Sequence, residues 1–126
     1  MVVNKNYLYS DITDKIIKAA LSVHNRLGPG LVEKLYQRAL KIELSNNGVR
    51  SQREKKIEMR YDGVNIGFDK VDFDVENKVL VEIKAVIELN EIHRAQMISY
   101  LKSSGRRVGL LINFGAIKLT IKRLIV

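Results

Sequence analysis

Apolar residues recur along this chain at two different spacings, which divide it into helical and extended segments. Residues 10–27 and 31–46 carry them every three or four positions, the spacing of one helix face. We expect two helices there, separated by the helix breaker Gly28-Pro29-Gly30, with Ser10 or Asp11 capping the first. The residues expected to face inward are Ile12, Ile16, Ala19, Ala20, Val23 and Leu27 in the first helix, and Leu31, Leu35, Ala39 and Ile42 in the second.

From residue 49 onward the apolar residues alternate with polar ones, which is the period of a β-strand. Residues 49–61 and 64–68 are expected to be strands joined by a turn at Asp62-Gly63, and residues 71–86 form a second hairpin pattern. The rest of the chain predicts a helix and two closing strands, at residues 89–104, 107–114 and 116–126, with Gly105 ending the helix.

This order of elements predicts an α/β (α+β) fold, in which a central mixed β-sheet is flanked by helices. At 126 residues, with 46% hydrophobic and 29% charged residues, the chain is expected to form a single domain over residues 1–126. It has no cysteine and no apolar stretch near the length of about 20 residues that spans a bilayer. The N-terminal run MVVNKNYLYSD lacks the apolar core of an export signal. These features predict a cytoplasmic protein that does not bind a membrane.

The hairpin pattern of residues 71–86 puts unusual chemistry on one side of the sheet. One face is apolar, and the other carries Asp72, Asp74, Glu82 and Lys84. If Asp74 pairs with Leu80, a three-residue loop remains at 76–78 and Asp72 comes opposite Glu82. The sequence therefore predicts two neighbouring carboxylates with an amine two residues further on.

Two like charges placed opposite each other are unfavourable unless a cation lies between them. A hard divalent cation such as Mg²⁺ or Mn²⁺ prefers oxygen ligands of this kind, and a nearby ammonium can stabilise charge on a phosphoryl group. The alternation alone also fits a solvated sheet face whose charges form cross-strand ion pairs, and that alternative stays open here.

The charge of the whole chain is strongly positive. Lys and Arg number 22 and Asp and Glu number 14, giving a net charge of +8, and no acidic residue follows Glu91. Such a one-signed surface attracts a polyanion, although it also serves solubility. The basic residues of this last part are Arg94, Lys102, Arg106, Arg107, Lys118, Lys122 and Arg123.

Several motifs together resemble a known family. Gly30-Leu31-Val32-Glu33-Lys34-Leu35-Tyr36 is similar to the G-x-x-E-x-x-Y signature of the GxxExxY proteins. The aspartate Asp72, followed about ten residues later by Glu82-Ile83-Lys84, resembles the motif of the PD-(D/E)xK nuclease superfamily, with Val71 in place of the proline. The later segments Gln96 with Tyr100-Leu101, and GLLINFG at residues 109–115, also match that branch.

This resemblance implies a restriction-endonuclease-like core in αβββαβ order with an extra N-terminal helix. It implies that Asp72 and Glu82 bind Mg²⁺ or Mn²⁺, joined by the backbone carbonyl of Ile83, and that Lys84 is the catalytic lysine. Asp74 stands where the family usually has an apolar residue, and we assign it no ligand role.

The resemblance also assigns residues on the flanking helices. Glu33 would be an additional acid that reaches the site, and Gln96 would line it; without the resemblance, Glu33 would simply complement the dipole of its helix. The residues expected to contact nucleic acid are Tyr100, Arg94, Lys102, Arg106 and Arg107.

The function expected from these features is metal-dependent hydrolysis of nucleic-acid phosphodiester bonds, with DNA favoured over RNA and a homodimer as a plausible assembly. A non-catalytic nucleic-acid-binding module on the same fold is one alternative, and a protein-interaction module is another. Metal-dependent cleavage would exclude the first alternative, and binding of nucleic acid would exclude the second.

Overall fold

The structure, a computed structural model, describes residues 7–126 and follows the predicted order of elements. The expectation about an export signal falls mainly on residues 1–6, which lie outside the described range. Within it, no helix combines the length and the apolar character needed to cross a membrane. The elements are α1 (Ser10–Leu27), α2 (Glu33–Asn46), β1 (Ser51–Tyr61), β2 (Val64–Val75), β3 (Val79–Lys84), α3 (Glu91–Ser104), β4 (Val108–Asn113) and β5 (Thr120–Ile125).

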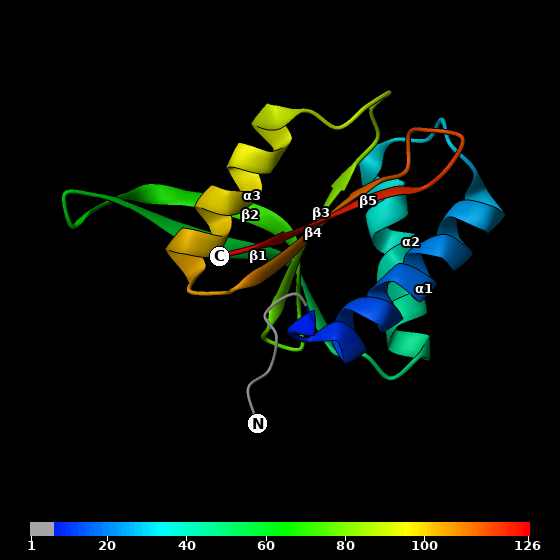
Figure 1. Cartoon of the computed structure of the whole chain (residues 1–126), viewed down its shortest axis with the longest axis horizontal. Helices are drawn as coiled ribbons and strands as arrows, with labels where there is room; N and C mark the ends of the chain where they lie inside the picture. Colours follow the sequence, from blue (N-terminus) through cyan, green and yellow to red (C-terminus); the bar gives the residue numbers. More distant parts are fainter. Residues whose placement is uncertain (1–6) are drawn as a thin grey trace.

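The five strands form one mixed sheet between two helical layers (Figure 1). Strands are ordered β1-β2-β3-β4-β5, and only β3 and β4 run parallel, because α3 carries the chain back between them. Helices α1 and α2 pack on one face through Ile16, Leu40, Phe73 and Ile83, and α3 packs on the other through Leu80, Met97, Leu101 and Leu111. The predicted mixed sheet flanked by helices is confirmed.

Helix α1 has the predicted extent but not the predicted cap. The N-cap residue is Tyr9, in a left-handed conformation with φ 58°, and no side chain caps the helix. Ser10 is already the first helical residue, and Asp11 lies in the first turn, where its charge favours the positive end of the helix dipole. The cap expected at Ser10 or Asp11 was therefore wrong.

The inward face of α2 also differs from the prediction. Leu31, Leu35 and Ile42 were expected inside, but they are 37%, 44% and 60% exposed. The buried residues are Tyr36, Gln37, Leu40 and Leu44. Helix α2 carries apolar residues on both stripes, so hydropathy does not decide between them. Hydrogen bonds of Tyr36 to the preceding turn and of Gln37 to β2, described below, fix the rotation of the helix.

The register of the β2–β3 hairpin is the predicted one. Asp74 pairs with Leu80 and Val75 with Val79, so that the turn contains residues 76–78. Asn77 takes a left-handed φ of 55° in this turn, a conformation that asparagine tolerates better than most residues.

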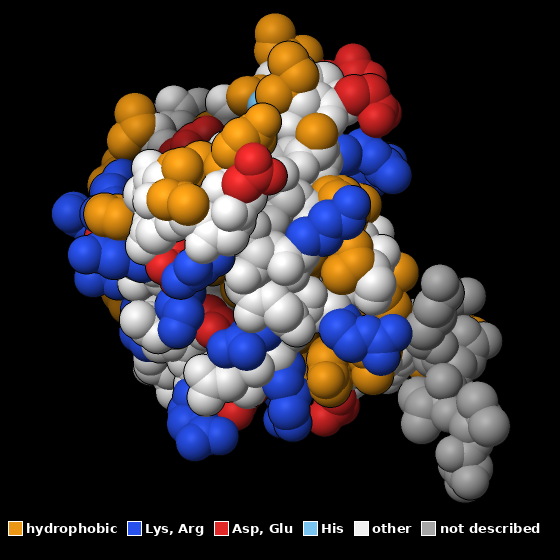
Figure 2. All heavy atoms as spheres, turned by 90° about the vertical axis from the view of Figure 1, so that its left-hand side faces the viewer, with side chains coloured by type: hydrophobic (Ala, Val, Ile, Leu, Met, Phe, Trp, Pro, Cys, Tyr) orange, Lys and Arg blue, Asp and Glu red, His pale blue; other side chains and the backbone are white. Residues whose placement is uncertain are grey.

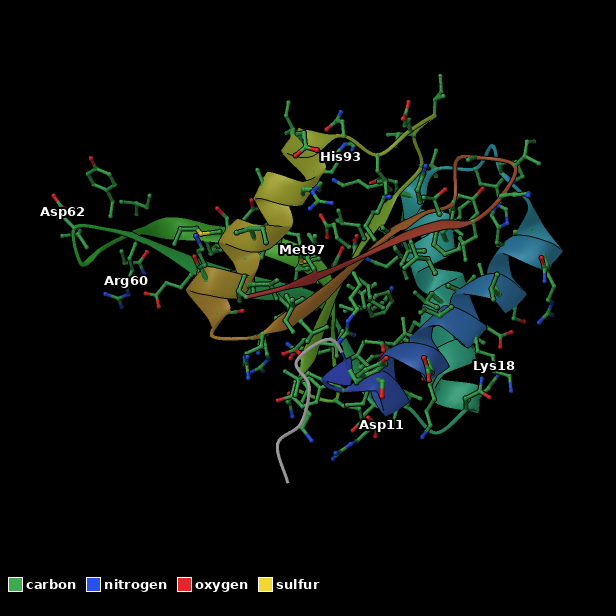
Figure 3. The ribbon with its side chains drawn as sticks, viewed as in Figure 1. Asp11, Lys18, Arg60, Asp62, His93 and Met97 are labelled. Carbon is green, nitrogen blue, oxygen red and sulfur yellow. The ribbon has the colours of Figure 1, made fainter. Side chains whose placement is uncertain are left out.

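Strands β1 and β2 extend well past β3 and form an arm, which we define as residues 55–71. Pairing of β2 with β3 involves only Phe73, Asp74 and Val75, whereas β1 and β2 stay paired to their ends. In Figure 3 Arg60 and Asp62 lie near the far end of this arm. The predicted strand at residues 64–68 is thus continuous with the first strand of the hairpin. The exposed apolar side chains of the arm are Tyr61, Val64, Ile66 and Phe68.

Candidate active site

The site is built where β2 changes the face it presents to the two helical layers. Phe73 lies in the core under α1 and α2, whereas Val71 lies in the core under α3. Two residues that far apart in a regular strand share one face, so β2 must rotate between them. Opposite this point in β1, Glu54 takes a left-handed φ of 53°, and the pairing skips it between Arg53 and Lys55. Asp72 therefore lies at a bend that residues from both layers can reach.

At this bend the backbone pairing of β2 with β3 ends, and hydrogen bonds between side chains and backbone amides connect the two strands instead. The amide of Asp72 donates to Glu82 Oε1 at 3.0 Å, and the amide of Ile83 donates to Asp72 Oδ2 at 2.7 Å. Each carboxylate is thus held by the strand that carries the other. The sequence predicted that Asp72 and Glu82 would be neighbours, and the structure brings them together through these two bonds.

The electrostatics of the pair are unfavourable for a doubly charged state. Glu82 is 8% exposed. Burial, followed by the charge of Asp72, raises the pKa of Glu82 to about 8, although the ammonium of Lys84 acts in the opposite direction. Lys84 Nζ lies 3.8 Å from Glu82 Oε2, too far for a strong hydrogen bond. The lysine therefore compensates the two acids only in part.

Helix α3 contributes the residue that positions Lys84. The Lys84 ammonium donates to Gln96 Oε1 at 3.2 Å. This helix begins after Asn90, whose side chain accepts from the amides of Ile92 and His93 in a capping box. Gln96 thus lies beside the predicted lysine, as expected for a residue that lines the site.

Tyr100, one turn after Gln96, is not on the surface. It is 2% exposed and belongs to the core under α3, which differs from its expected role in contacting nucleic acid. Burial and the nearby carboxylates of Asp69 and Glu82 raise the pKa of its hydroxyl, which therefore stays protonated. The helical spacing correctly placed Tyr100 on the same side of α3 as Gln96, but at Tyr100 that side is covered by the sheet.

Gln37 on α2 is a residue of this site that the sequence reasoning missed. Its Nε2 donates to Asp72 Oδ1 at 2.8 Å, from the layer opposite to α3. It is 2% exposed. The available signal was its polar character directly after the G-x-x-E-x-x-Y motif, but the predicted inward face of α2 did not include it.

Glu33 lies one helical turn before Gln37 and is exposed. In the described part of the chain, no three His, Cys, Asp or Glu residues come close enough to hold one metal ion together. The structure therefore does not join Glu33 with Asp72 and Glu82 into one ligand group. The neighbouring residue Lys34 forms an ion pair with Glu54, which connects the start of α2 to the bend.

The tyrosine of the motif has a structural task. The Tyr36 hydroxyl donates to the carbonyl of Gly28 at 2.6 Å and accepts from the amide of Leu31 at 3.1 Å. Its ring stacks on Phe114 with centroids 4.7 Å apart. Tyr36 thereby fixes the turn at residues 28–31, and with it the start of the helix that carries Glu33 and Gln37.

Two glycines of the GLLINFG run allow the close packing behind the site. A Cβ on Gly109 would lie 2.5 Å from the sulfur of Met97, so the glycine lets α3 approach the sheet. A Cβ on Gly115 would lie 2.5 Å from the backbone of Val86, just after Lys84. The side chain of Asn113 bonds both the amide and the carbonyl of Val86, at 3.0 and 2.9 Å. These contacts fix the chain where it leaves β3.

The basic residues predicted to bind nucleic acid are in different situations. Arg94, Lys102 and Arg107 are exposed. Arg106 instead pairs with the buried Asp74, whose Oδ2 lies 2.8 Å from its guanidinium, so its charge is largely used inside the protein. Figure 2 shows Lys and Arg side chains spread over the face seen along the arm, with apolar and acidic side chains among them.

The donor set at the bend fits a hard divalent cation. Two carboxylates lie together, partly buried, with one ammonium that balances them only in part. Mg²⁺ and Mn²⁺ commonly bind through one or two carboxylates, with water and phosphate oxygens completing the shell. In addition, Gln37 Oε1 is buried without a hydrogen-bond donor among the described residues. Asp72 and Glu82 are therefore the residues that can hold such an ion.

Comparison with known proteins shows which superfamily the chain belongs to. A model of the PD-(D/E)XK nuclease superfamily matches residues 10–124. The fold is similar to the crystal structure of SSO0001, with a TM-score of 0.58 and 20% identity over 74% of this chain and 50% of that one. The chain thus spans about half the length of SSO0001, and at this identity the likeness concerns the fold alone. A comparison with curated proteins gives no match. On the match over residues 10–124, the chain belongs to the PD-(D/E)XK nuclease superfamily.

Proposed function

We propose that this protein is a metal-dependent nuclease of the GxxExxY branch, which hydrolyses phosphodiester bonds of nucleic acid with DNA as the favoured substrate. The observation that carries the proposal is the carboxylate pair at the bend of β2, with Lys84 and Gln96 beside it. A solvated sheet face does not need one buried and one partly buried acid that hold each other's strand.

In this mechanism Asp72, Glu82 and the backbone carbonyl of Ile83 would hold Mg²⁺ or Mn²⁺. When bound, the ion would supply charge stabilisation for the phosphate and would lower the pKa of water. Lys84, oriented by Gln96, stabilises the attacking water and the charge that develops on the phosphate. Glu33 is exposed at the start of α2, outside the carboxylate pair, and would act there as an additional acid.

The test is cleavage of labelled DNA and RNA, single-stranded and double-stranded, with Mg²⁺ or Mn²⁺ and with EDTA. We expect metal-dependent cleavage that falls at least 100-fold in Lys84→Ala. Lys118→Ala, at an exposed lysine in the loop before β5, is the matched control. If Lys84→Ala cleaves as fast as the wild type, the assigned role of this lysine is wrong, and binding without cleavage would favour the non-catalytic module.

The proposal includes a homodimer. The exposed apolar residues of the arm, Tyr61, Val64, Ile66 and Phe68, offer one surface for self-association. Light scattering over a range of concentrations tests this part, and a single monomer mass throughout would remove it without affecting the proposed chemistry.

A further inference from the structure

Gln37 is a buried polar side chain that reaches the site from the helical layer opposite to α3. Its side chain is 2% exposed, and its amide nitrogen donates to Asp72 Oδ1 at 2.8 Å. The other oxygen of the same carboxylate, Oδ2, accepts from the backbone amide of Ile83 at 2.7 Å. Each oxygen of Asp72 thus has one donor from a different element, and together these donors fix the plane of the carboxylate.

The orientation of the Gln37 amide follows from this contact. A carboxylate oxygen accepts hydrogen bonds, so Asp72 Oδ1 faces the NH₂ group of Gln37 and not its carbonyl oxygen. The carbonyl oxygen Oε1 is buried, and it accepts no hydrogen bond from the described residues. Burial of an unpaired polar atom costs folding free energy. An apolar side chain of the same length would avoid that cost, and what the glutamine supplies in exchange is its hydrogen bond to Asp72.

We propose that Gln37 is a positioning residue of the metal site, which orients the carboxylate of Asp72 for the cation. The inference rests on the proposed function, since it takes Asp72 as a metal ligand. Residues that hydrogen-bond to a metal ligand set its orientation, and their loss typically lowers metal affinity by about 10-fold to 100-fold. Among the described residues, the side chain of Gln37 makes its hydrogen bond to Asp72 and acts through it.

The test compares Gln37→Met with the wild type by calorimetric titration with Mn²⁺ and by thermal unfolding without metal. Methionine keeps the length and the unbranched shape but removes both the donor and the unpaired acceptor. We expect the dissociation constant for Mn²⁺ to rise about 10-fold or more. The metal-free midpoint should change little, because the loss of the hydrogen bond to Asp72 and the removal of the unpaired acceptor oppose each other. Gln52→Met, at an exposed glutamine of β1, is the matched control and should change neither value.

Gln37→Glu serves as a second variant, because it keeps the size but replaces the donor with a second negative charge. It should lower the metal-free midpoint through repulsion with Asp72, and added Mn²⁺ should recover part of that loss.

The outcomes separate this inference from the proposed function. If the wild type binds Mn²⁺ and Gln37→Met binds it equally well, Gln37 has no positioning role and the proposed function stands. A lower metal-free midpoint in Gln37→Met with unchanged affinity would show a purely structural role. If the wild type binds no divalent metal at all, the proposed metal site fails and this inference fails with it.

Discussion

Glu82 is the residue of the site whose charge state can be tested most directly. Its carboxylate accepts from the amide of Asp72, and its pKa is raised to about 8 by burial and by the charge of Asp72. An acid in this state binds either a proton or a cation more readily than an exposed glutamate does. Removing its charge should therefore change both the metal response and the pH dependence of stability.

The substitution Glu82→Gln should remove most of the stabilisation that a divalent metal gives to the folded protein. An ion that binds only the folded state stabilises it by about 2.7 kcal/mol at a free concentration of 100 times its Kd, or several degrees in midpoint temperature for a domain of this size. We expect Mn²⁺ to raise the midpoint of the wild type at neutral pH and to have little effect on Glu82→Gln. The metal-free midpoint of the variant should be higher, because a neutral side chain avoids both the burial of a charge and its repulsion with Asp72. Thermal unfolding with and without Mn²⁺ measures both values, and an equal metal response in the two proteins would mean that the acids do not share an ion.

The raised pKa of Glu82 also sets the sign of a pH effect in the metal-free protein. Because the folded state holds this proton more tightly than the unfolded state, the contribution of Glu82 is fully stabilising below about pH 4.5 and is lost as the pH rises to about 8. The free energy of unfolding of the wild type should therefore decline over this window relative to Glu82→Gln. Urea unfolding of both proteins at about pH 5, 6, 7 and 8 measures the difference. A constant difference across the series would show that the pKa of Glu82 is not raised.

At the scale of elements, a buried ion pair ties the end of α3 to β2. Asp74 is 2% exposed and pairs with Arg106, just beyond the glycine that ends α3, while Lys55 Nζ lies 3.9 Å away. This acid shares a strand with Asp72, but its partners show that it serves the assembly of the elements. The pairing with Arg106 agrees with the absence of a ligand role for Asp74.

The substitution Asp74→Asn should therefore lower stability without affecting metal binding. Removing one charge of a buried pair leaves the other uncompensated, at a cost of about 3 kcal/mol, reduced here because the Arg106 side chain is 27% exposed. Urea unfolding should show this loss, and the Mn²⁺ response should equal that of the wild type. Asp14→Asn, at an exposed aspartate of α1, is the matched control. Loss of the Mn²⁺ response in Asp74→Asn would place this acid in the metal site after all.

At the scale of the whole molecule, the net charge of +8 and the absence of acidic residues after Glu91 predict electrostatic binding of a polyanion. Affinity for nucleic acid should fall steeply with salt, because each phosphate neutralised by a lysine or arginine releases about 0.9 counterion on duplex DNA. The exposed residues Lys102 and Arg107 are better candidates for such contacts than Arg106, whose guanidinium is engaged by Asp74.

Charge reversal distinguishes these basic residues. Lys102→Glu with Arg107→Glu should weaken binding and reduce the slope of log affinity against log salt by about 1 to 2. Fluorescence anisotropy with labelled duplex and single strand, over a series of salt concentrations, measures the slope. Binding that does not respond to salt, or no binding, would favour a protein partner over nucleic acid.

The sequence by itself determined the order of the elements, the hairpin register and the identity of the acid pair. Each of these depends on local features, namely the alternation of apolar residues, the turn at residues 76–78, and the spacing between Asp72 and Glu82. Such features act between residues that are close in the chain, so they can be recognised without knowing how distant elements pack.

Only the tertiary structure decided which face of α2 points inward, the bend of β2 at Asp72, and the partners of Gln37 and Asp74. Helix α2 has two stripes that could be buried, and the choice depends on Tyr36 and Gln37 meeting residues 8 and 35 positions away along the chain. Likewise, Asp74 is paired across 32 positions with Arg106. Where two faces of an element are similarly hydrophobic, the one that becomes buried is the one whose polar side chains find partners. These partners come together only in the folded chain, and a buried polar group without a partner costs free energy.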